Sequence, residues 1–234
     1  LLSRIDMILV RTVIAKSKPS YLLIALFITS LIPFASTLRW KGILLAQGTK
    51  LPFVDALRAV LMSNVLNSFL PSKGGDIVKA FYLKKHGGLS LGVGSVILER
   101  LIDLFVLGAL GIIGYLTSGM IWGLWTGLFL IVSVCSVIGI IGYMPLKDSF
   151  RYPKISNTAN NFRKLFRLWL NRPRAMIQTF MASTLVWGGA CGIVTCLCFA
   201  FDAGLSIGYA LSICPLSILA GLIPLTLSGI GTRD

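Results

Sequence analysis

Charged residues are scarce in this chain, and acidic residues are the scarcest. Asp, Glu, Lys and Arg make up 13% of the sequence, with 8 acidic residues against 22 basic ones. A soluble domain of this size carries about 25% charged residues, so the composition excludes an ordinary soluble domain. Several apolar runs reach the roughly 18–20 residues that a helix needs to cross a bilayer. We therefore predict an all-α, polytopic transmembrane helix bundle in the cell (inner or cytoplasmic) membrane.

Sequence signatures of enzyme chemistry are also scarce. The chain has one histidine, His86, in a turn, and its five cysteines all lie inside apolar runs, where cysteine acts as a small hydrophobe. There is no Gly-x-x-x-x-Gly-Lys-[Ser/Thr] phosphate loop and no His-Glu-x-x-His zinc motif. We expect no enzyme activity, no catalytic residue, no metal and no cofactor.

The formal net charge of +14 raises the question of nucleic-acid binding. The basic residues, however, lie in short segments between apolar runs, as membrane topology and anionic lipid headgroups require. We expect membrane lipids with anionic headgroups as partners, and no nucleic acid.

A short polar interruption, Pro71-Ser-Lys-Gly-Gly-Asp76, separates the apolar runs 59–70 and 77–83. Proline lacks a backbone donor and glycine favours open backbone, so a regular helix does not continue here. The same succession of apolar run, proline, paired glycines, one basic residue and one acid returns at 210–223 and 224–234. Two such broken segments indicate a transporter-type binding site. The alternative is two unrelated loops at the membrane surface.

The hydropathy pattern predicts spans at residues 21–38, 91–118, 120–143 and 175–201, with 209–223 entering the membrane. Arg39, Trp40 and Lys41 end the first span as an interface anchor. Segment 52–70 either crosses the membrane or forms half of a re-entrant hairpin. It should face protein or a cavity, because its helix carries four polar residues: Asp55, Arg58, Asn64 and Asn67.

The most basic segment is the loop 145–174, which we expect in the cytoplasm, with the turns at Gly119 and Asp202 on the other side. The N-terminus is cytoplasmic if 52–70 crosses and outside if that segment is re-entrant. Within the loop, apolar residues follow a helical stripe: Phe162, Leu165, Phe166, Trp169 and Leu170. This stripe predicts an amphipathic helix lying on the membrane surface.

Glu99, Arg100 and Asp103 are the costliest residues to bury, at about 2.5–3.5 kcal/mol for an ionised group near a helix centre. One interpretation is an ion pair that neutralises itself within the helix. The other is that the acids orient a cation from a broken segment, because two acids and one arginine leave a local negative excess.

We predict a substrate-binding site in which Lys73, Arg233, Glu99 and Asp103 converge on one polar cavity. Lys73 and Arg233 would contact an anion there. Neighbouring glycines would supply backbone N–H groups, and the remaining polar residues would brace the cations or line the path. The full set is Asn67, Lys73, Gly74, Gly75, Asp76, Glu99, Arg100, Asp103, Gly229, Gly231, Arg233 and Asp234.

Three motifs resemble the lysylphosphatidylglycerol synthase transmembrane-domain family of flippase-like proteins. They are Asn67-x-x-x-Pro-x-Lys-x-Gly-Asp76, Glu99-Arg-x-x-Asp103 and Pro224-x-x-x-x-Gly-x-Gly-x-x-Asp234. The family usually has Arg, Glu and Glu where this chain has Lys73, Asp76 and Asp234. The resemblance runs from Arg39 to the last residue and implies one domain, residues 1–234, which in relatives continues with further spans.

The resemblance implies a translocator of a phospholipid or lipid-linked anionic substrate between leaflets. It also implies a synthase domain as a partner in bifunctional relatives, although nothing in this chain resembles that soluble domain. Two alternatives are a metal-dependent transferase or phosphatase for polyprenyl-phosphates, with Glu99 and Asp103 as ligands, and a non-catalytic subunit of a glycosyltransferase. A homo-oligomer is compatible with each of them.

Overall fold

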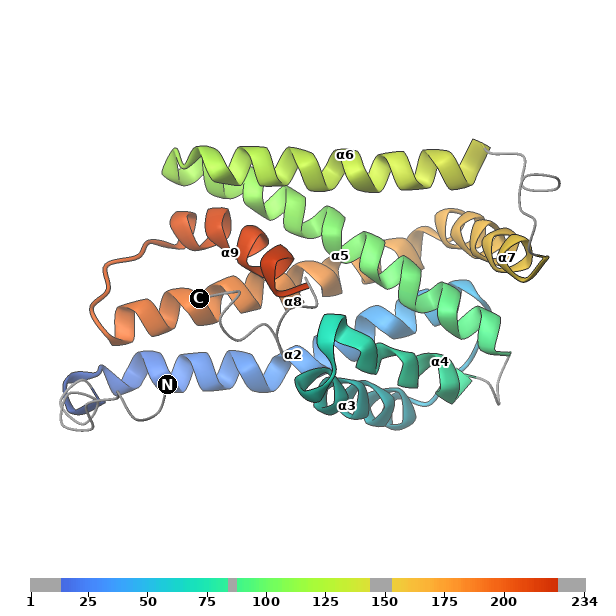
Figure 1. Ribbon diagram of the computed structural model, residues 1–234. Helices are drawn as coiled ribbons and strands as arrows, with labels where there is room; N and C mark the ends of the chain where they lie inside the picture. The colour runs from blue at the N-terminus through green and yellow to red at the C-terminus, as the bar shows by residue number, and fades with distance from the viewer. Residues whose placement is uncertain (1–13, 84–87, 144–152, 223–234) are drawn as a thin grey trace.

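The computed structural model describes residues 14–83, 88–143 and 153–222, and all regular structure in these ranges is helical (Figure 1). The elements are α2 (Pro19–Ala46), α3 (Phe53–Phe69), the 3₁₀ turn η2 (Pro71–Asp76), α4 (Ile77–Leu83), α5 (Leu89–Ser118), α6 (Ile121–Tyr143), α7 (Pro153–Leu170), α8 (Pro173–Ala200) and α9 (Ile207–Leu222). The all-α prediction is confirmed.

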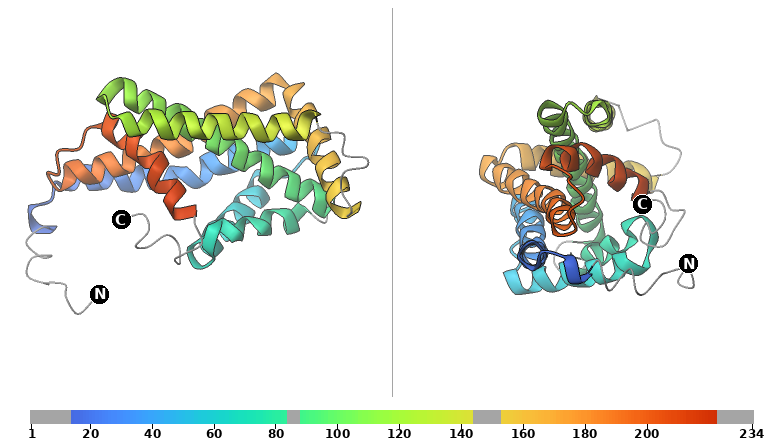
Figure 2. Two further views of the ribbon diagram at one scale, coloured as in Figure 1. Left: turned by 45° about the horizontal axis from the view of Figure 1, so that its top comes forward. Right: turned by 90° about the vertical axis from the view of Figure 1, so that its left-hand side faces the viewer.

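Three helices in the described ranges, α2, α6 and α8, are long and apolar enough to cross a membrane. The 28 residues of α2 and of α8 correspond to about 42 Å at 1.5 Å per residue, more than the hydrocarbon core. The central helix is α5, which packs against α2, α4, α6, α7, α8 and α9 (Figures 1 and 2). A multi-pass membrane bundle is the result.

One end of the bundle joins three segments that are distant in sequence. Lys18, just before α2, pairs with Asp202 in the α8–α9 turn, with Nζ and Oδ1 2.5 Å apart. The hydrogen bond to Asp202 and its charge raise the pKa of Lys18. The start of α9 lies against the end of α5, where Ser118 and Ser212 share a hydrogen bond of 3.1 Å. The turns that follow Ser118 and Ala200 therefore share one end, as predicted, while α7 lies at the other (Figure 1).

Gly108, Gly111 and Gly114 lie about one helical turn apart on α5, a spacing that predicts close packing against neighbouring helices. A Cβ atom at Gly108 would lie 2.9 Å from the backbone oxygen of Gly127 on α6. A Cβ atom at Gly114 would lie 2.5 Å from the backbone nitrogen of Ser212 on α9. Without these side chains, α5 contacts the backbones of both neighbours directly.

Helix α2 does not end in an interface anchor. It continues past Leu38 to Ala46, and the side chains of Arg39 and Trp40 are buried inside the protein. The indole nitrogen of Trp40 donates a hydrogen bond of 3.2 Å to the hydroxyl of Ser95 on α5. The interface prediction is therefore wrong for these two residues, because each finds a polar partner within the bundle.

The segment 52–70 forms α3, which turns at η2 and is followed by the short α4, packed on both α3 and α5. Arg58 and Asn64 are exposed, so neither packs against the described protein, and whether they face a cavity stays a prediction. Asn67 does face protein, and its side chain is bonded to η2.

Helix α7 forms as predicted, but most of its apolar stripe faces the protein, and only Leu170 at the end of the stripe is exposed. Phe162, Leu165 and Trp169 are buried against the bundle, and a hydrogen bond of 3.3 Å joins the indole nitrogen of Trp169 to the hydroxyl of Thr179 on α8. Leu165 lies 3.2 Å from the Cβ position of Gly94 on α5. The predicted surface-lying helix is corrected: its apolar side packs on α5 and α8 rather than on lipid.

We expect Leu165→Ala to lower the free energy of unfolding by about 2 kcal/mol, because it leaves a cavity between α7 and α5. Leu168→Ala on the exposed side of the same helix is the matched control and should change it by less than about 0.5 kcal/mol. Denaturant unfolding in detergent, followed by tryptophan fluorescence, measures both. A larger loss for Leu168→Ala would restore the membrane-surface interpretation.

Candidate functional site

The turn η2 sits directly on the backbone of α3. A Cβ atom at Gly75 would lie 2.6 Å from the carbonyl oxygen of Ser63 and 2.7 Å from the backbone nitrogen of Asn67. The backbone nitrogen of Gly75 donates a hydrogen bond of 2.9 Å to the side-chain oxygen of Asn67. The N–H group of Gly75 is thus already used within the protein, which corrects its predicted role in an anion-binding nest.

Asp76, the last residue of η2, is buried and contacts four side chains. One of its carboxylate oxygens, Oδ1, accepts hydrogen bonds from the Ser63 hydroxyl at 2.6 Å and from the Asn67 amide at 3.3 Å. The same oxygen lies 3.4 Å from the ammonium of Lys79, and Oδ2 accepts a hydrogen bond from Arg100. Asp76 therefore ties the turn to α3, α4 and α5 together.

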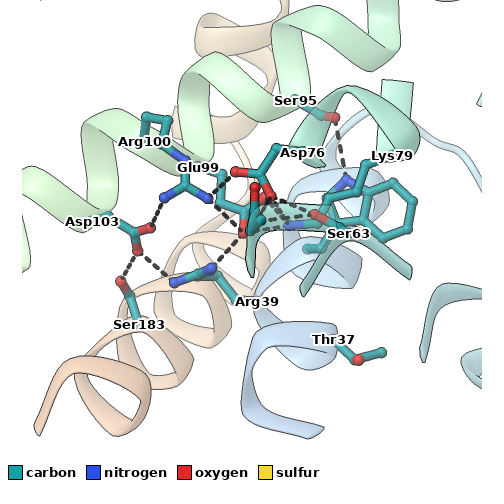
Figure 3. A network of polar contacts seen from close by, with 12 residues as sticks. Thr37, Arg39, Ser63, Asp76, Lys79, Ser95, Glu99, Arg100, Asp103 and Ser183 are labelled. Atoms are coloured by element: carbon teal, nitrogen blue, oxygen red, sulfur yellow. Dashed lines mark hydrogen bonds and ion pairs between the residues drawn. The ribbon is translucent and has the colours of Figure 1, made fainter. Parts of the chain in front are cut away.

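The two acids of α5, Glu99 and Asp103, each contact at least one cation from another helix (Figure 3). Glu99 accepts hydrogen bonds from Lys79 at 3.0 and 3.1 Å and pairs with Arg39. Asp103 accepts one hydrogen bond of 2.5 Å from Arg39, and it lies 3.3 Å from Arg100. Arg39 on α2 thus bridges both acids of α5.

Asp103 has one further donor. The hydroxyl of Ser183 on α8 donates a hydrogen bond of 2.7 Å to the same oxygen that Arg39 contacts. Its other oxygen, Oδ2, accepts no hydrogen bond among the described residues. The network therefore extends from α2 across α5 to α8.

We call these six charged residues the charge cluster: Arg39, Asp76, Lys79, Glu99, Arg100 and Asp103. Its three cations match its three carboxylates, and five of the six side chains are 6% exposed or less. An isolated charge would be very costly inside a membrane bundle, but paired and hydrogen-bonded charges are tolerated. Arg39 lies seven residues before the end of α2, which is about 10 Å at a rise of about 1.5 Å per residue. The cluster is therefore not at the end of this helix.

The ion pair that the first interpretation of α5 predicts is present, whereas the second, a cation supplied by a broken segment, stays a prediction. Arg100 does pair with Asp103 within the helix. The negative excess also attracts further cations, but they are Arg39 and Lys79. The predicted Lys73 lies in η2, and its side chain is outside the described residues, so its placement near the acids stays a prediction.

Arg39 and Lys79 are the site residues that the sequence prediction missed. Lys79 carried a usable signal, because it is a lone charge in the apolar run 77–83, one helical turn after Asp76. Arg39 carried none, because a cation at the end of an apolar run is typical of a membrane interface.

Helix α9 precedes the second broken segment in the sequence. Helix α9 contacts η2, so the helix that precedes residues 223–234 reaches the first break. Gly229, Gly231, Arg233 and Asp234 lie outside the described residues, and their role stays a prediction.

The chemistry of the cluster differs from that of a metal site. Among the described residues, no group of three His, Cys, Asp or Glu side chains is placed to hold a metal ion. Glu99 and Asp103 also face arginine and lysine side chains, which would repel a cation. A Gly-x-Ser-x-Gly pattern at residues 88–92 lies at the start of α5, with Gly88 just before the helix, whereas a hydrolase nucleophile elbow follows a strand.

Comparison with known proteins gives one family. A family model described as the lysylphosphatidylglycerol synthase TM region matches residues 1–234. Two archaeal relatives are similar over most of the chain. The UPF0104 membrane protein MJ1078 of Methanocaldococcus jannaschii is 29% identical over 183 residues, which cover 72% of this chain and 75% of that protein. A UPF0104 membrane protein of Methanothermobacter thermautotrophicus is 24% identical over 250 residues, covering 94% and 74%.

The UPF0104 membrane protein MJ1595 of Methanocaldococcus jannaschii is 30% identical over 109 residues, and this match covers 44% of the chain but 32% of that protein. The chain therefore spans about a third of the length of this relative. No solved structure matches the chain.

Proposed function

Because this chain belongs to the family of the lysylphosphatidylglycerol synthase transmembrane region, we propose that it moves a phospholipid or a lipid-linked anionic molecule between the leaflets of the cell membrane. The proposal concerns translocation and not synthesis of the lipid, and membrane lipids are the partners that it requires.

The charge cluster is the observation that carries this proposal. It joins the broken segment η2 to α2, α4 and α5 inside a membrane bundle, where well-packed apolar side chains would stabilise a purely structural contact at least as well. Ionisable residues buried within a membrane bundle typically mark the path of a substrate or ion. A polar headgroup needs such a path to cross the hydrocarbon core.

We further propose that α3, η2 and α4 form a re-entrant hairpin, so that segment 52–70 enters the membrane as half of this hairpin and does not cross it. The hairpin turns at η2, and its last residue, Asp76, bonds to the α5 residue Arg100. In transporters, broken helices of this kind meet the substrate near the middle of the membrane. The turn η2, at the tip of the hairpin, would then lie beside the path of the lipid headgroup.

Reconstitution into vesicles tests translocation. The chain is placed in liposomes that contain a fluorescent phospholipid, and a membrane-impermeant reductant then bleaches the outer leaflet only. Translocation is expected to expose more than the outer-leaflet fraction of the label, both with and without a metal chelator. Glu99→Gln should slow the movement, and Arg58→Gln, which removes an exposed cation outside the cluster, should not.

The remaining outcomes separate the alternatives. Bleaching that stops at the outer-leaflet fraction in every phospholipid of a panel would contradict the proposal and favour a non-catalytic subunit. Chemical conversion of a polyprenyl-phosphate that a chelator abolishes would favour the metal-dependent enzyme.

A further inference from the structure

We propose that Arg100 is the exchangeable cation of the charge cluster, and that it leaves its carboxylates to bind the phosphate of a lipid headgroup. This inference rests on the proposed function, and it specifies the residue and the chemical group at which the lipid is held.

Accessibility sets Arg100 apart from the rest of the cluster. Its side chain is 28% exposed, whereas the other five are 6% exposed or less. An approaching headgroup therefore reaches Arg100 before it reaches any other charge of the cluster.

The two carboxylates that lie closest to Arg100, Asp76 and Asp103, each have other hydrogen-bond donors or cations beside them. If Arg100 moves away, Asp76 keeps the Ser63 hydroxyl at 2.6 Å and the ammonium of Lys79 at 3.4 Å. Asp103 likewise keeps Arg39 at 2.5 Å and the Ser183 hydroxyl at 2.7 Å. Neither carboxylate is left as an unpaired buried charge, which is the outcome that makes a broken ion pair costly.

The buried cations Arg39 and Lys79 lack this freedom. Arg39 holds Glu99 and Asp103 at once, and Lys79 holds Glu99 through two hydrogen bonds. Glu99 has no contact with a serine or asparagine side chain among its described hydrogen bonds, so it depends on cations, and these two lie closer to it than Arg100, which is 4.0 Å away. Of the three cations, Arg100 is therefore the one whose release leaves the others in place.

The guanidinium of Arg100 has donors to spare for a phosphate. An arginine has five N–H donors, and the described hydrogen bonds of this one go to Asp76 alone. Its Nε atom has no hydrogen-bond partner among the described residues. The planar fork of an arginine matches two phosphate oxygens, which a lysine cannot do.

Exposed apolar residues on α5 and α4, close in sequence to Arg100 and to its partner Asp76, are the reason for assigning the phosphate to a lipid. Ile97 lies one helical turn before Arg100 on α5 and is exposed. Ile77 directly follows Asp76, and Phe81 lies one turn further along α4; both are more than half exposed. Acyl chains are the ligand that such side chains favour beside a bound phosphate.

Arginine modification tests the inference on the unaltered chain in detergent. Phenylglyoxal is added, and the rate at which it modifies each arginine is followed by mass spectrometry. Dioctanoyl phosphatidylglycerol should slow modification of Arg100, while dioctanoylglycerol, which has the same chains and no phosphate, should not. Arg58, an exposed arginine outside the cluster, is the internal control and should react equally in all samples.

Inorganic phosphate separates the two sources of the ligand. Protection by the phospholipid alone supports a lipid headgroup, and equal protection by inorganic phosphate supports free phosphate at the same residue. Protection by neither compound, or by dioctanoylglycerol as well, would overturn the assignment of Arg100. Transport in vesicles without protection of Arg100 would refute this inference alone, and protection without transport would refute the proposed function alone.

Variants add a readout that does not depend on transport. Arg100→Gln should weaken phospholipid binding by roughly tenfold or more, because charge-assisted hydrogen bonds are lost, and Arg100→Lys should weaken it less. Arg100→Gln should nevertheless unfold at a higher denaturant concentration than Arg39→Met. If the two variants are equally unstable, Arg100 is a fixed structural cation and the proposal fails.

Discussion

Replacing Arg39 by methionine is expected to lower the free energy of unfolding by about 3–5 kcal/mol, the range for breaking a buried ion pair from one side. Arg39 is 4% exposed and contacts Glu99 and Asp103, so its loss leaves three carboxylates of the charge cluster facing two cations. Methionine keeps most of the side-chain volume, which restricts the effect to the charge and its hydrogen bonds. Denaturant unfolding in detergent measures the loss.

Lys41→Met is the matched control, because it removes a cation two residues along the same helix. Lys41 lies over the ring of Phe53, 5.6 Å from its centroid, and it has no partner in the cluster. Its replacement should cost no more than about 1 kcal/mol. Equal losses for the two variants would mean that the cluster does not depend on the charge of Arg39.

A double substitution isolates the electrostatic part of this effect. Adding Glu99→Gln to Arg39→Met restores equal numbers of cations and carboxylates, and Lys79 can then pair with Asp76 alone. The double variant should therefore be more stable than the sum of the two single losses predicts. Strict additivity would show that the two residues do not act as a pair.

Gly75→Ala is expected to lower the free energy of unfolding by about 3 kcal/mol, at the upper end for overpacking, and to stop transport. The new methyl group would lie 2.6 Å from the carbonyl oxygen of Ser63. Helix backbone cannot yield as a flexible side chain does, so η2 must move away from α3. That movement would also displace Asp76 from Ser63, Lys79 and Arg100.

The neighbouring glycine supplies the control. A Cβ atom at Gly74 would lie 3.6 Å from the Cβ of Leu70, which is an ordinary contact. Both substitutions restrict the unfolded chain in the same way, so the difference between them reports the close approach to α3. Similar stability and transport in Gly74→Ala and Gly75→Ala would show that this approach is not required.

Local spacing predicted the features that lie within one helix. The Arg100–Asp103 pair follows from positions one turn apart, and the close packing of α5 follows from the spacing of Gly108, Gly111 and Gly114. The position of the helix break at Pro71–Asp76 follows from its proline and glycines.

What the sequence could not predict depends on which neighbour a helix face meets. The stripe on α7 is equally apolar whether it faces lipid or protein, so its burial against α5 and α8 is decided by tertiary packing. Arg39 is paired with residues 60 and 64 positions away, and no periodicity within one helix reveals such a partner.

The long separation between Arg39 and its partners also sets an order of events during synthesis. Arg39 leaves the ribosome 60 residues before Glu99, which corresponds to about 3–12 s of translation. During that interval neither of the two carboxylates that Arg39 contacts in the folded protein has been made, so we expect the end of α2 to stay near the polar headgroups. When α5 arrives with Glu99 and Asp103, Arg39 can be drawn inward. The hydroxyl of Ser183 follows 80 residues after Asp103, so the last member of the network is in place only when α8 has been made.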